Sequence, residues 1–214
     1  MTSLRLKTAA VIYGVLVAAA ITIGIVRGAP NICIHQNGIL NGYVSAVSRF
    51  SIGAAIGILL GLGVAWLTRF SVYRYHWARK LHAEFRGLFG PISGSDIFAF
   101  ASISAVAEEL FFRGALQPII GIAATSIVFG IVHLAPNRHF VPWTIQALAM
   151  GFVLCGLFYL TGDLTAPILA HFTINYQNLH FINRYNPTPK LPRAFGSSIE
   201  NKPSSGQLIS RHPQ

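Results

Sequence analysis

The sequence has few charged residues for its length. Asp, Glu, Lys and Arg make up only 10% of its 214 residues, and 53% of the residues are hydrophobic. An ordinary soluble domain carries about 25% charged residues. The composition therefore excludes an ordinary soluble domain and predicts a protein whose apolar surface faces lipid.

Cysteines and several common catalytic motifs are also scarce or absent. The two cysteines, Cys33 and Cys155, lie far apart, and Cys155 is inside an apolar stretch, so neither a disulfide framework nor a zinc finger is predicted. The sequence contains no HExxH or GxSxG motif, and its apolar stretches hold no lysine and no pair of aspartates. These absences argue against a zincin, a nucleophile-elbow hydrolase, a Ser/Lys dyad and an intramembrane aspartyl protease.

Apolar stretches long enough to cross a bilayer recur along the chain. A bilayer core about 30 Å thick requires roughly 20 mostly apolar residues per helix. The predicted fold is therefore all-α, a polytopic transmembrane helix bundle with about six spans. We expect the first span to be retained rather than cleaved as a signal peptide, because it lacks a clear small-residue cleavage site. The predicted spans are residues 8–26, 47–68, 96–117, 121–135, 142–161 and 164–182.

Basic residues fall mainly on one side of this predicted bundle. Of the 16 Lys and Arg residues, 13 lie in the N-terminus, the second and fourth connections and the C-terminal tail. By the positive-inside rule, this bias predicts an even number of spans and two cytoplasmic termini. The location predicted from this pattern is a membrane that the chain crosses several times. This topology accounts for the net charge of +10, so no nucleic-acid partner is predicted.

The chain is predicted to have three parts. Residues 1–94 hold two transmembrane helices and a basic cytoplasmic connection. In this connection, residues 69–89 mix five basic residues with apolar and aromatic ones, which fits an amphipathic helix on the inner leaflet or a basic loop needed only for topology. Residues 95–182 form the membrane core, and residues 183–214, rich in Pro, Ser, Asn and Lys, form a disordered cytoplasmic tail.

Two of the six acidic residues, Glu108 and Glu109, are inside a predicted span. An ionisable side chain at bilayer depth costs at least about 2.5 kcal/mol. The adjacent pair therefore indicates a functional site or an obligatory internal ion pair. Glu109 and Arg113 are four residues apart and can pair on one helix face, which would leave Glu108 free for another role.

Histidine and asparagine provide further polar groups in later spans. His133 lies near the end of the fourth span, four residues after Phe129, and His171 lies inside the sixth, four residues before Asn175. A single buried histidine is most often only a core residue. Two histidines together with two glutamates, in a chain so poor in polar side chains, favour a shared polar site.

Helix geometry predicts that these groups meet at one depth. At 1.5 Å per residue, Glu108 and His133 lie about 15 and 18 Å from a turn expected at residues 118–121. His171 lies about 10 Å beyond Leu164, on the same side of the bundle. The three side chains are therefore expected to converge near mid-depth, somewhat toward the non-cytoplasmic side.

Such a set of residues supports two kinds of hydrolytic chemistry. A carboxylate beside two imidazoles can deprotonate a water molecule, while an amide such as that of Asn175 stabilises an oxyanion. Alternatively, Glu108, His133 and His171 can bind a divalent metal such as zinc and lower the pKa of a bound water. The residues alone leave both routes open.

Three short motifs, in order on successive apolar stretches, resemble the signature motifs of the CAAX protease and bacteriocin-processing (CPBP, or Abi) family of intramembrane endopeptidases. The motifs are Glu108-Glu109-x-x-x-Arg113, Phe129-x-x-x-His133 and His171-x-x-x-Asn175. The resemblance covers about residues 95–180 and implies that residues 95–182 are a catalytic core of glutamic or metalloprotease type. It implies hydrolysis of a peptide bond in a membrane-anchored or lipidated protein or peptide, as C-terminal or leader processing. It also implies a bacterial-type enzyme, so the expected location is an integral multi-pass protein of a bacterial inner (plasma) membrane.

The resemblance also implies a role for each residue of the motifs. Glu108 would be the general base, Glu109 a supporting carboxylate held by Arg113, and Asn175 the oxyanion donor. His133 and His171 would be partners of the water, or of a metal if one is present.

Three other functions remain open. Glu and His residues inside a bundle also serve proton or cation carriers, and a non-catalytic immunity or scaffold protein could use the same fold. A haem protein with His133 and His171 as axial ligands would leave the glutamates unexplained. No catalytic role is predicted for the remaining histidines, which are His35, His76, His82, His139, His180 and His212.

Overall fold

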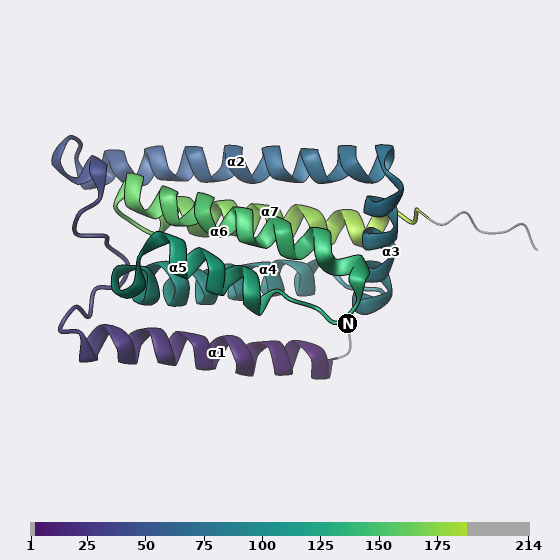
Figure 1. The fold of residues 1–214 in the computed structure, drawn as a ribbon, viewed down its shortest axis with the longest axis horizontal. Helices are drawn as coiled ribbons and strands as arrows, with labels where there is room; N and C mark the ends of the chain where they lie inside the picture. Colours follow the sequence, from purple (N-terminus) through teal and green to yellow (C-terminus); the bar gives the residue numbers. More distant parts are fainter. Residues whose placement is uncertain (1–2, 188–214) are drawn as a thin grey trace, which may run out of the picture.

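Over residues 3–187, which a computed structural model describes, the chain folds into a bundle of α-helices with no β-strand (Figure 1). The α-helices of this part are α1 (Ser3–Val26), α2 (Ala46–Arg74), α3 (His76–Phe89), α4 (Gly94–Glu109), α5 (Gln117–Val132), α6 (Val141–Thr161) and α7 (Thr165–Arg184). A π-helix, η2 (Leu110–Leu116), joins α4 to α5, and short 3-10 helices η1 (Ile39–Gly42) and η3 (Arg138–Phe140) lie in connections. The all-α prediction is confirmed. The tail predicted at residues 183–214 lies almost entirely outside the described residues.

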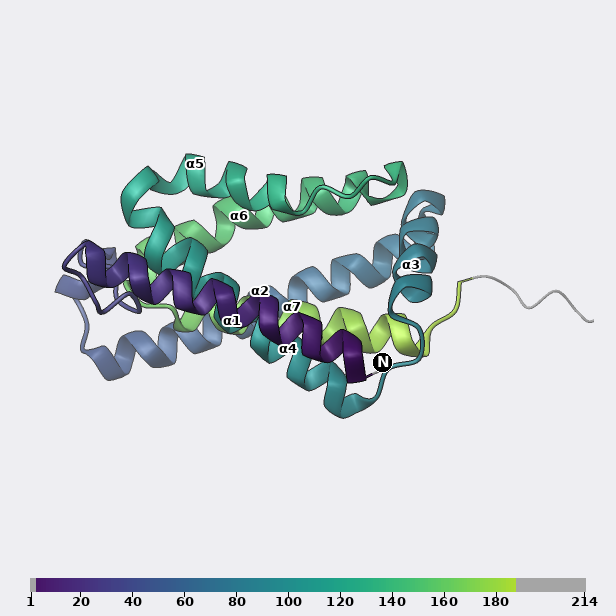
Figure 2. The same ribbon diagram turned by 90° about the horizontal axis from the view of Figure 1, so that it is seen from below.

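Each predicted span overlaps a helix, and the described chain has four stretches long and apolar enough to cross a membrane. These stretches are Leu6–Val26, Ala46–Arg74, Gly94–Val132 and Arg138–Thr161. The third contains two predicted spans, because the backbone leaves the helical region at Gly121 (φ 79°, ψ 174°) and the chain reverses direction near there (Figure 2). Large hydrophobic side chains are exposed along these helices, so the protein is an integral membrane protein.

Helix α7, which matches the sixth predicted span, is too polar to belong to these four stretches. It carries His171, Asn175 and Gln177 among other polar residues. It packs against α2, α4 and α6 and lies in the middle of the bundle (Figure 1). Its neighbours therefore separate much of α7 from lipid, which allows polar side chains at this depth.

The most basic connections gather at one end of the bundle. The N-terminus, α3, η3 and the end of α7 lie at this end, whereas the connections that follow α1, α4 and α6 lie at the other (Figure 1). This arrangement is expected for an even number of spans with both termini on one side.

Helix α3 lies across this basic end of the bundle (Figures 1 and 2). The basic connection predicted at residues 69–89 divides at Tyr75, which is extended (φ −116°, ψ 138°), because the residues up to Arg74 continue α2. His82 of α3 is buried, and its Nε2 lies 2.9 Å from the carbonyl oxygen of Tyr185. Burial lowers the pKa of His82, so the neutral ring donates this hydrogen bond and fixes α3 to the end of α7.

A row of small residues on α2 lets α7 approach closely. Gly53, Gly57, Gly61 and Ala65 recur every four residues and are buried. This spacing places them on one helix face, as in other membrane helices that pack closely. Their neighbours on α7 include Ala166, Ala170 and Thr173.

Substituting Gly57 by alanine is expected to destabilise the bundle by about 1–3 kcal/mol, the usual effect of overpacking a core. The reason is that a Cβ at Gly57 would overlap the backbone carbonyl oxygen of Ala166. Gly63 provides a matched control on the same helix, because a Cβ there meets nothing within 4 Å. Thermal unfolding in detergent should show a lower melting temperature for Gly57→Ala than for Gly63→Ala. Equal melting temperatures would contradict this packing.

Candidate active site

The predicted site residues come from three parts of the bundle. Glu108 and Glu109 end α4, and Arg113 follows in η2. His133 comes directly after α5, which ends at Val132, three residues before the end of the predicted span at residue 135, and it has φ −94° and ψ 9°. His171 and Asn175 lie on α7. The structure brings the first five of these side chains into one connected group.

The connection between α4 and α5 is a π-helix, which the sequence analysis did not predict. It covers Leu110–Leu116 and includes Arg113. A π-helical turn is rare and occurs frequently at functional sites, because the wider turn changes the direction of side chains. Here the Arg113 side chain is directed back into the bundle and is fully buried.

A buried ion pair occupies the centre of the group. The Arg113 Nη1 donates to Glu109 Oε1 over 2.9 Å, and both side chains are 0% exposed. The same oxygen lies 2.7 Å from His171 Nδ1. Because an ionised carboxylate only accepts hydrogen bonds, His171 donates its Nδ1 proton to Glu109. In the neutral ring, Nε2 of His171 is then left as a free acceptor.

Glu108 faces both histidines from the neighbouring position. Its Oε2 lies 3.9 Å from His133 Nε2 and 4.0 Å from His171 Nε2. These separations exceed a direct hydrogen bond of about 2.7–3.2 Å. Oε2 is buried and has no hydrogen-bond partner within the described part of the chain.

The tautomer of His133 is fixed in the same way as that of His171. Its Nδ1 lies 2.7 Å from the carbonyl oxygen of Phe129, and only a protonated nitrogen can donate to that oxygen. The neutral ring therefore presents its Nε2 lone pair toward Glu108. Three acceptor atoms, from Glu108, His133 and His171, thus converge, and a water molecule held by them could donate a proton to the carboxylate.

Two aromatic rings, from Phe129 and Trp143, pack against the polar side chains of the site. The Phe129 ring has the Arg113 guanidinium 4.3 Å from its centroid and the His133 ring 4.5 Å from it. The Trp143 ring of α6 contacts the His133 ring edge-on, with a centroid distance of 5.1 Å. These cation–π and ring contacts stabilise the observed positions of the Arg113 and His133 side chains.

Asn175 lies one helical turn beyond His171, on the same face of α7. Its Nδ2 donates to the hydroxyl of Ser104 over 3.0 Å, and Ser104 is one turn before Glu108 on α4. The antiparallel helices therefore make two matched contacts, one between Ser104 and Asn175 and one between Glu108 and His171. The second amide proton of Asn175 is left for another acceptor. The sequence analysis missed Ser104, although its four-residue spacing from Glu108 could have indicated it.

The histidines and Glu108 do not fit a zinc site in this arrangement. Two ligands of a tetrahedral zinc ion lie about 3.3 Å apart, given bond lengths of about 2.0–2.1 Å. The separations of 3.9 and 4.0 Å from Glu108 are longer. In the described residues, no group of three or more His, Cys, Asp or Glu side chains is placed to hold a metal ion.

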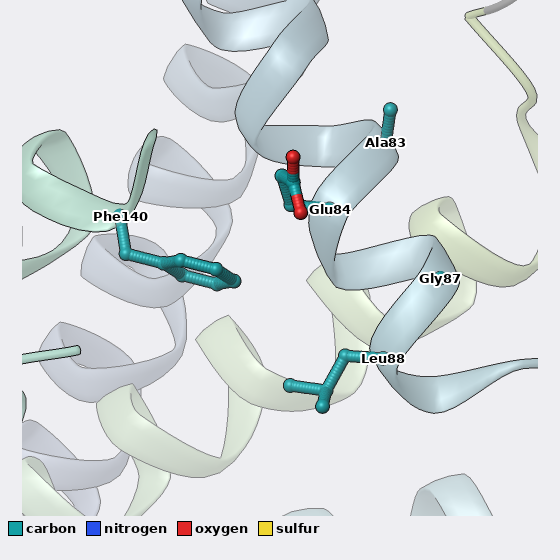
Figure 3. Close-up of a pocket in the computed structure, with 5 residues that line it drawn as sticks. All are labelled: Ala83, Glu84, Gly87, Leu88 and Phe140. Carbon is teal, nitrogen blue, oxygen red and sulfur yellow. The ribbon is translucent and has the colours of Figure 1, made fainter. Parts of the chain in front are cut away.

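Two surface pockets lie away from this group of residues. One pocket, of about 380 Å³, lies between α3 and Phe140 and is lined by Glu84 and apolar neighbours (Figure 3). The other, of about 500 Å³, lies at the opposite end of the bundle beside Arg49 and Asp163. Neither pocket is lined by any of the six predicted site residues.

The histidines without a predicted catalytic role have other contacts. His35, in the connection after α1, contacts the rings of Phe158 and Tyr159 on α6, and His180 contacts Tyr176 on α7. His212 lies outside the described residues.

Comparison with known proteins supports the resemblance inferred from the motifs. Residues 93–177, which include all six predicted site residues, match the family described as type II CAAX prenyl endopeptidase Rce1-like. The chain is also similar to the uncharacterized protein YpbD of Bacillus subtilis (strain 168), with 34% identity over 90 residues. That match covers 41% of this chain and 46% of YpbD, so the similarity spans about half of the relative. No solved structure matches the chain.

Proposed function

We propose, from the premise that residues 93–177 form a domain of the type II CAAX prenyl endopeptidase Rce1-like kind, that this protein is an intramembrane endopeptidase. The observation that carries the proposal is the convergence of Glu108 Oε2 with Nε2 of His133 and of His171 inside the bundle. Acceptors so arranged suit the activation of one water molecule.

The reaction starts with a water molecule held by these acceptors. Glu108 removes a proton from the water as its oxygen forms a bond to the carbonyl carbon of the scissile peptide. The carbonyl becomes a tetrahedral oxyanion, and the free amide proton of Asn175 donates to it. The C–N bond then breaks, and the proton held by Glu108 passes to the leaving amine. The products are a carboxylic acid and an amine, with no change of oxidation state.

The buried pair of Glu109 and Arg113 supports this chemistry indirectly. Glu109 fixes His171 with Nε2 directed toward the water, and Arg113 is the buried counter-charge of Glu109. We propose these two residues as positioning residues, with Glu108, His133, His171 and Asn175 acting on the water or the substrate.

The location of the group suggests the class of substrate. The residues lie within a bundle of helices that face lipid, so a peptide reaches them from the membrane or its surface. We propose a membrane-associated or lipidated protein or peptide as substrate, cleaved near a terminus. We further propose a bacterial inner membrane as the location, with both termini in the cytoplasm.

Cleavage in reconstituted liposomes tests the proposal. Wild type and His171→Ala are each incubated with a panel of lipidated and transmembrane-tailed peptides, with and without a chelator. We expect the wild type to cleave at least one peptide in both lanes, and His171→Ala to cleave none. Equal cleavage by both proteins would contradict the proposed site. If chelation abolished cleavage and zinc restored it, the attacking water would be activated by a metal ion and not by Glu108 alone.

The same liposomes test the carrier function that the sequence left open. If the wild type cleaves nothing but moves protons or cations, and His171→Ala loses this flux, the endopeptidase proposal must be abandoned.

A further inference from the structure

Tyr13 of α1 is a polar residue beside the candidate active site. It has no role in the reaction proposed for Glu108, the two histidines and Asn175. Its hydroxyl lies near the Glu108 side chain, within reach of a hydrogen bond. Its ring lies edge-on to Phe100 of α4, with centroids 6.0 Å apart. Tyr13 therefore contacts α4 at two positions, through its ring and through its hydroxyl.

The position of α1 against α4 and η2 sets the depth of Tyr13. Helix α1 packs against these two elements and runs beside α4 in the same direction (Figures 1 and 2). Ala20 of α1 packs against Ala115 of η2. The separation of Tyr13 from Ala20 equals that of Glu108 from Ala115 along the chain, so both contacts belong to one register.

The far end of α1 is fixed in this register by a further contact. Arg27 Nη1 donates to the carbonyl oxygen of Ala115 over 3.3 Å. Ile32, in the connection after α1, packs in the same cluster as Ala20 and Ala115. Helix α1 is therefore held against η2 on the C-terminal side of Tyr13, although only 11% of its apolar stretch is buried.

The Glu108 carboxylate needs a donor to fix its rotation. The terminal torsion of a glutamate has a broad energy profile. Its Oε2, which faces both imidazoles, has no hydrogen-bond partner among residues 3–187. A donor on the other oxygen would hold Oε2 in place while leaving it free to accept a proton.

We infer that Tyr13 is a positioning residue for Glu108, donating its hydroxyl proton to one carboxylate oxygen so that the other faces His133 and His171. The effect of this contact on kcat rests on the proposed function, whereas the contact itself does not. It assigns a part of the site to α1, which precedes the segment matched by the family.

A kinetic comparison tests the consequence for catalysis. Tyr13→Phe keeps the ring contact with Phe100 and removes only the hydroxyl. Because a hydrogen bond to a charged group is strong, we expect kcat to fall about ten- to hundredfold with KM unchanged. Tyr159→Phe on α6 is the matched control, because its ring contacts His35 at the other end of the bundle, and its kcat should stay within about twofold of wild type. An unchanged kcat for Tyr13→Phe would overturn the inference while leaving the proposed function intact.

A thermal unfolding cycle tests the contact itself, whether or not any peptide is cleaved. We compare wild type, Tyr13→Phe, Glu108→Leu and the double variant in detergent. Loss of the hydroxyl should lower the melting temperature of the wild type by about 2–4 °C, but should have little effect in the Glu108→Leu background, where no acceptor remains. Equal shifts in both backgrounds would show that the hydroxyl does not act through Glu108 and would overturn the inference. Absence of cleavage together with unequal shifts would count against the proposed function alone.

Discussion

Replacing Arg113 by leucine should destabilise the folded protein by about 3–5 kcal/mol, the usual effect of removing one partner of a buried ion pair. Both side chains of the pair with Glu109 are 0% exposed. Without the guanidinium, Glu109 would remain as a buried carboxylate with His171 as its hydrogen-bond partner. The variant would also lose the contact of Arg113 with the Phe129 ring, 4.3 Å away. Chemical or thermal unfolding in detergent measures the loss.

A double variant separates the unpaired charge from the lost packing. In Arg113→Leu/Glu109→Leu neither charge remains, and buried pairs replaced by apolar residues are often as stable as the original. We therefore expect the double variant to recover most of the loss. It should remain about 1 kcal/mol below wild type, because His171 loses its acceptor. A double variant less stable than the single one would show that packing, rather than the unpaired carboxylate, dominates.

Much of the fold could be predicted because membrane helices have simple requirements. Each span needs a long apolar stretch, and the rise of 1.5 Å per residue is fixed. The expected turn at residues 118–121 matches the break at Gly121. These facts alone predict Glu108, His133 and His171 at one depth. In the structure, Glu108 Oε2 lies 3.9 Å from His133 Nε2 and 4.0 Å from His171 Nε2.

The features that sequence reasoning missed depend on contacts between distant segments. The π-helix at Leu110–Leu116 cannot be recognised from periodicity, because a single wide turn leaves no repeat to detect. The contact of Ser104 with Asn175 depends on the register of α4 against α7, which the sequence does not specify. Tyr13 was missed because α1 appeared only as a first apolar span, and nothing in its sequence indicates which face meets α4.

The sixth span shows where hydropathy alone falls short. Residues 164–182 were predicted to cross the membrane, and they form α7, but its polar residues keep it below the hydropathy of the other spans. A polar helix at this depth is stable because α2 and α4 pack against it. The row of small residues on α2 allows this close packing, so the apolar helices accommodate the polar one that carries His171 and Asn175.

Glu108→Gln should abolish catalysis while leaving the fold intact. The amide has the same shape as the carboxylate but cannot accept the proton of the water, and loss of a general base lowers kcat by about 10²–10⁴-fold. Stability should change little, because Oε2 of Glu108 has no hydrogen-bond partner in the described structure to lose. Cleavage assays and melting temperatures on the same preparation measure both effects, with Glu84→Gln on α3 as a control expected to match wild type.

The neighbouring residue should respond in the opposite way. Glu109→Gln leaves Arg113 as a buried cation without a counter-charge, so it should lower stability by about 3–5 kcal/mol, whatever its effect on kcat. The two glutamates are adjacent in sequence, yet one faces the histidines across 3.9 and 4.0 Å and the other accepts hydrogen bonds of 2.9 and 2.7 Å. If Glu108→Gln instead unfolded the protein and Glu109→Gln only lost activity, the assignment of base and positioning residue would have to be exchanged.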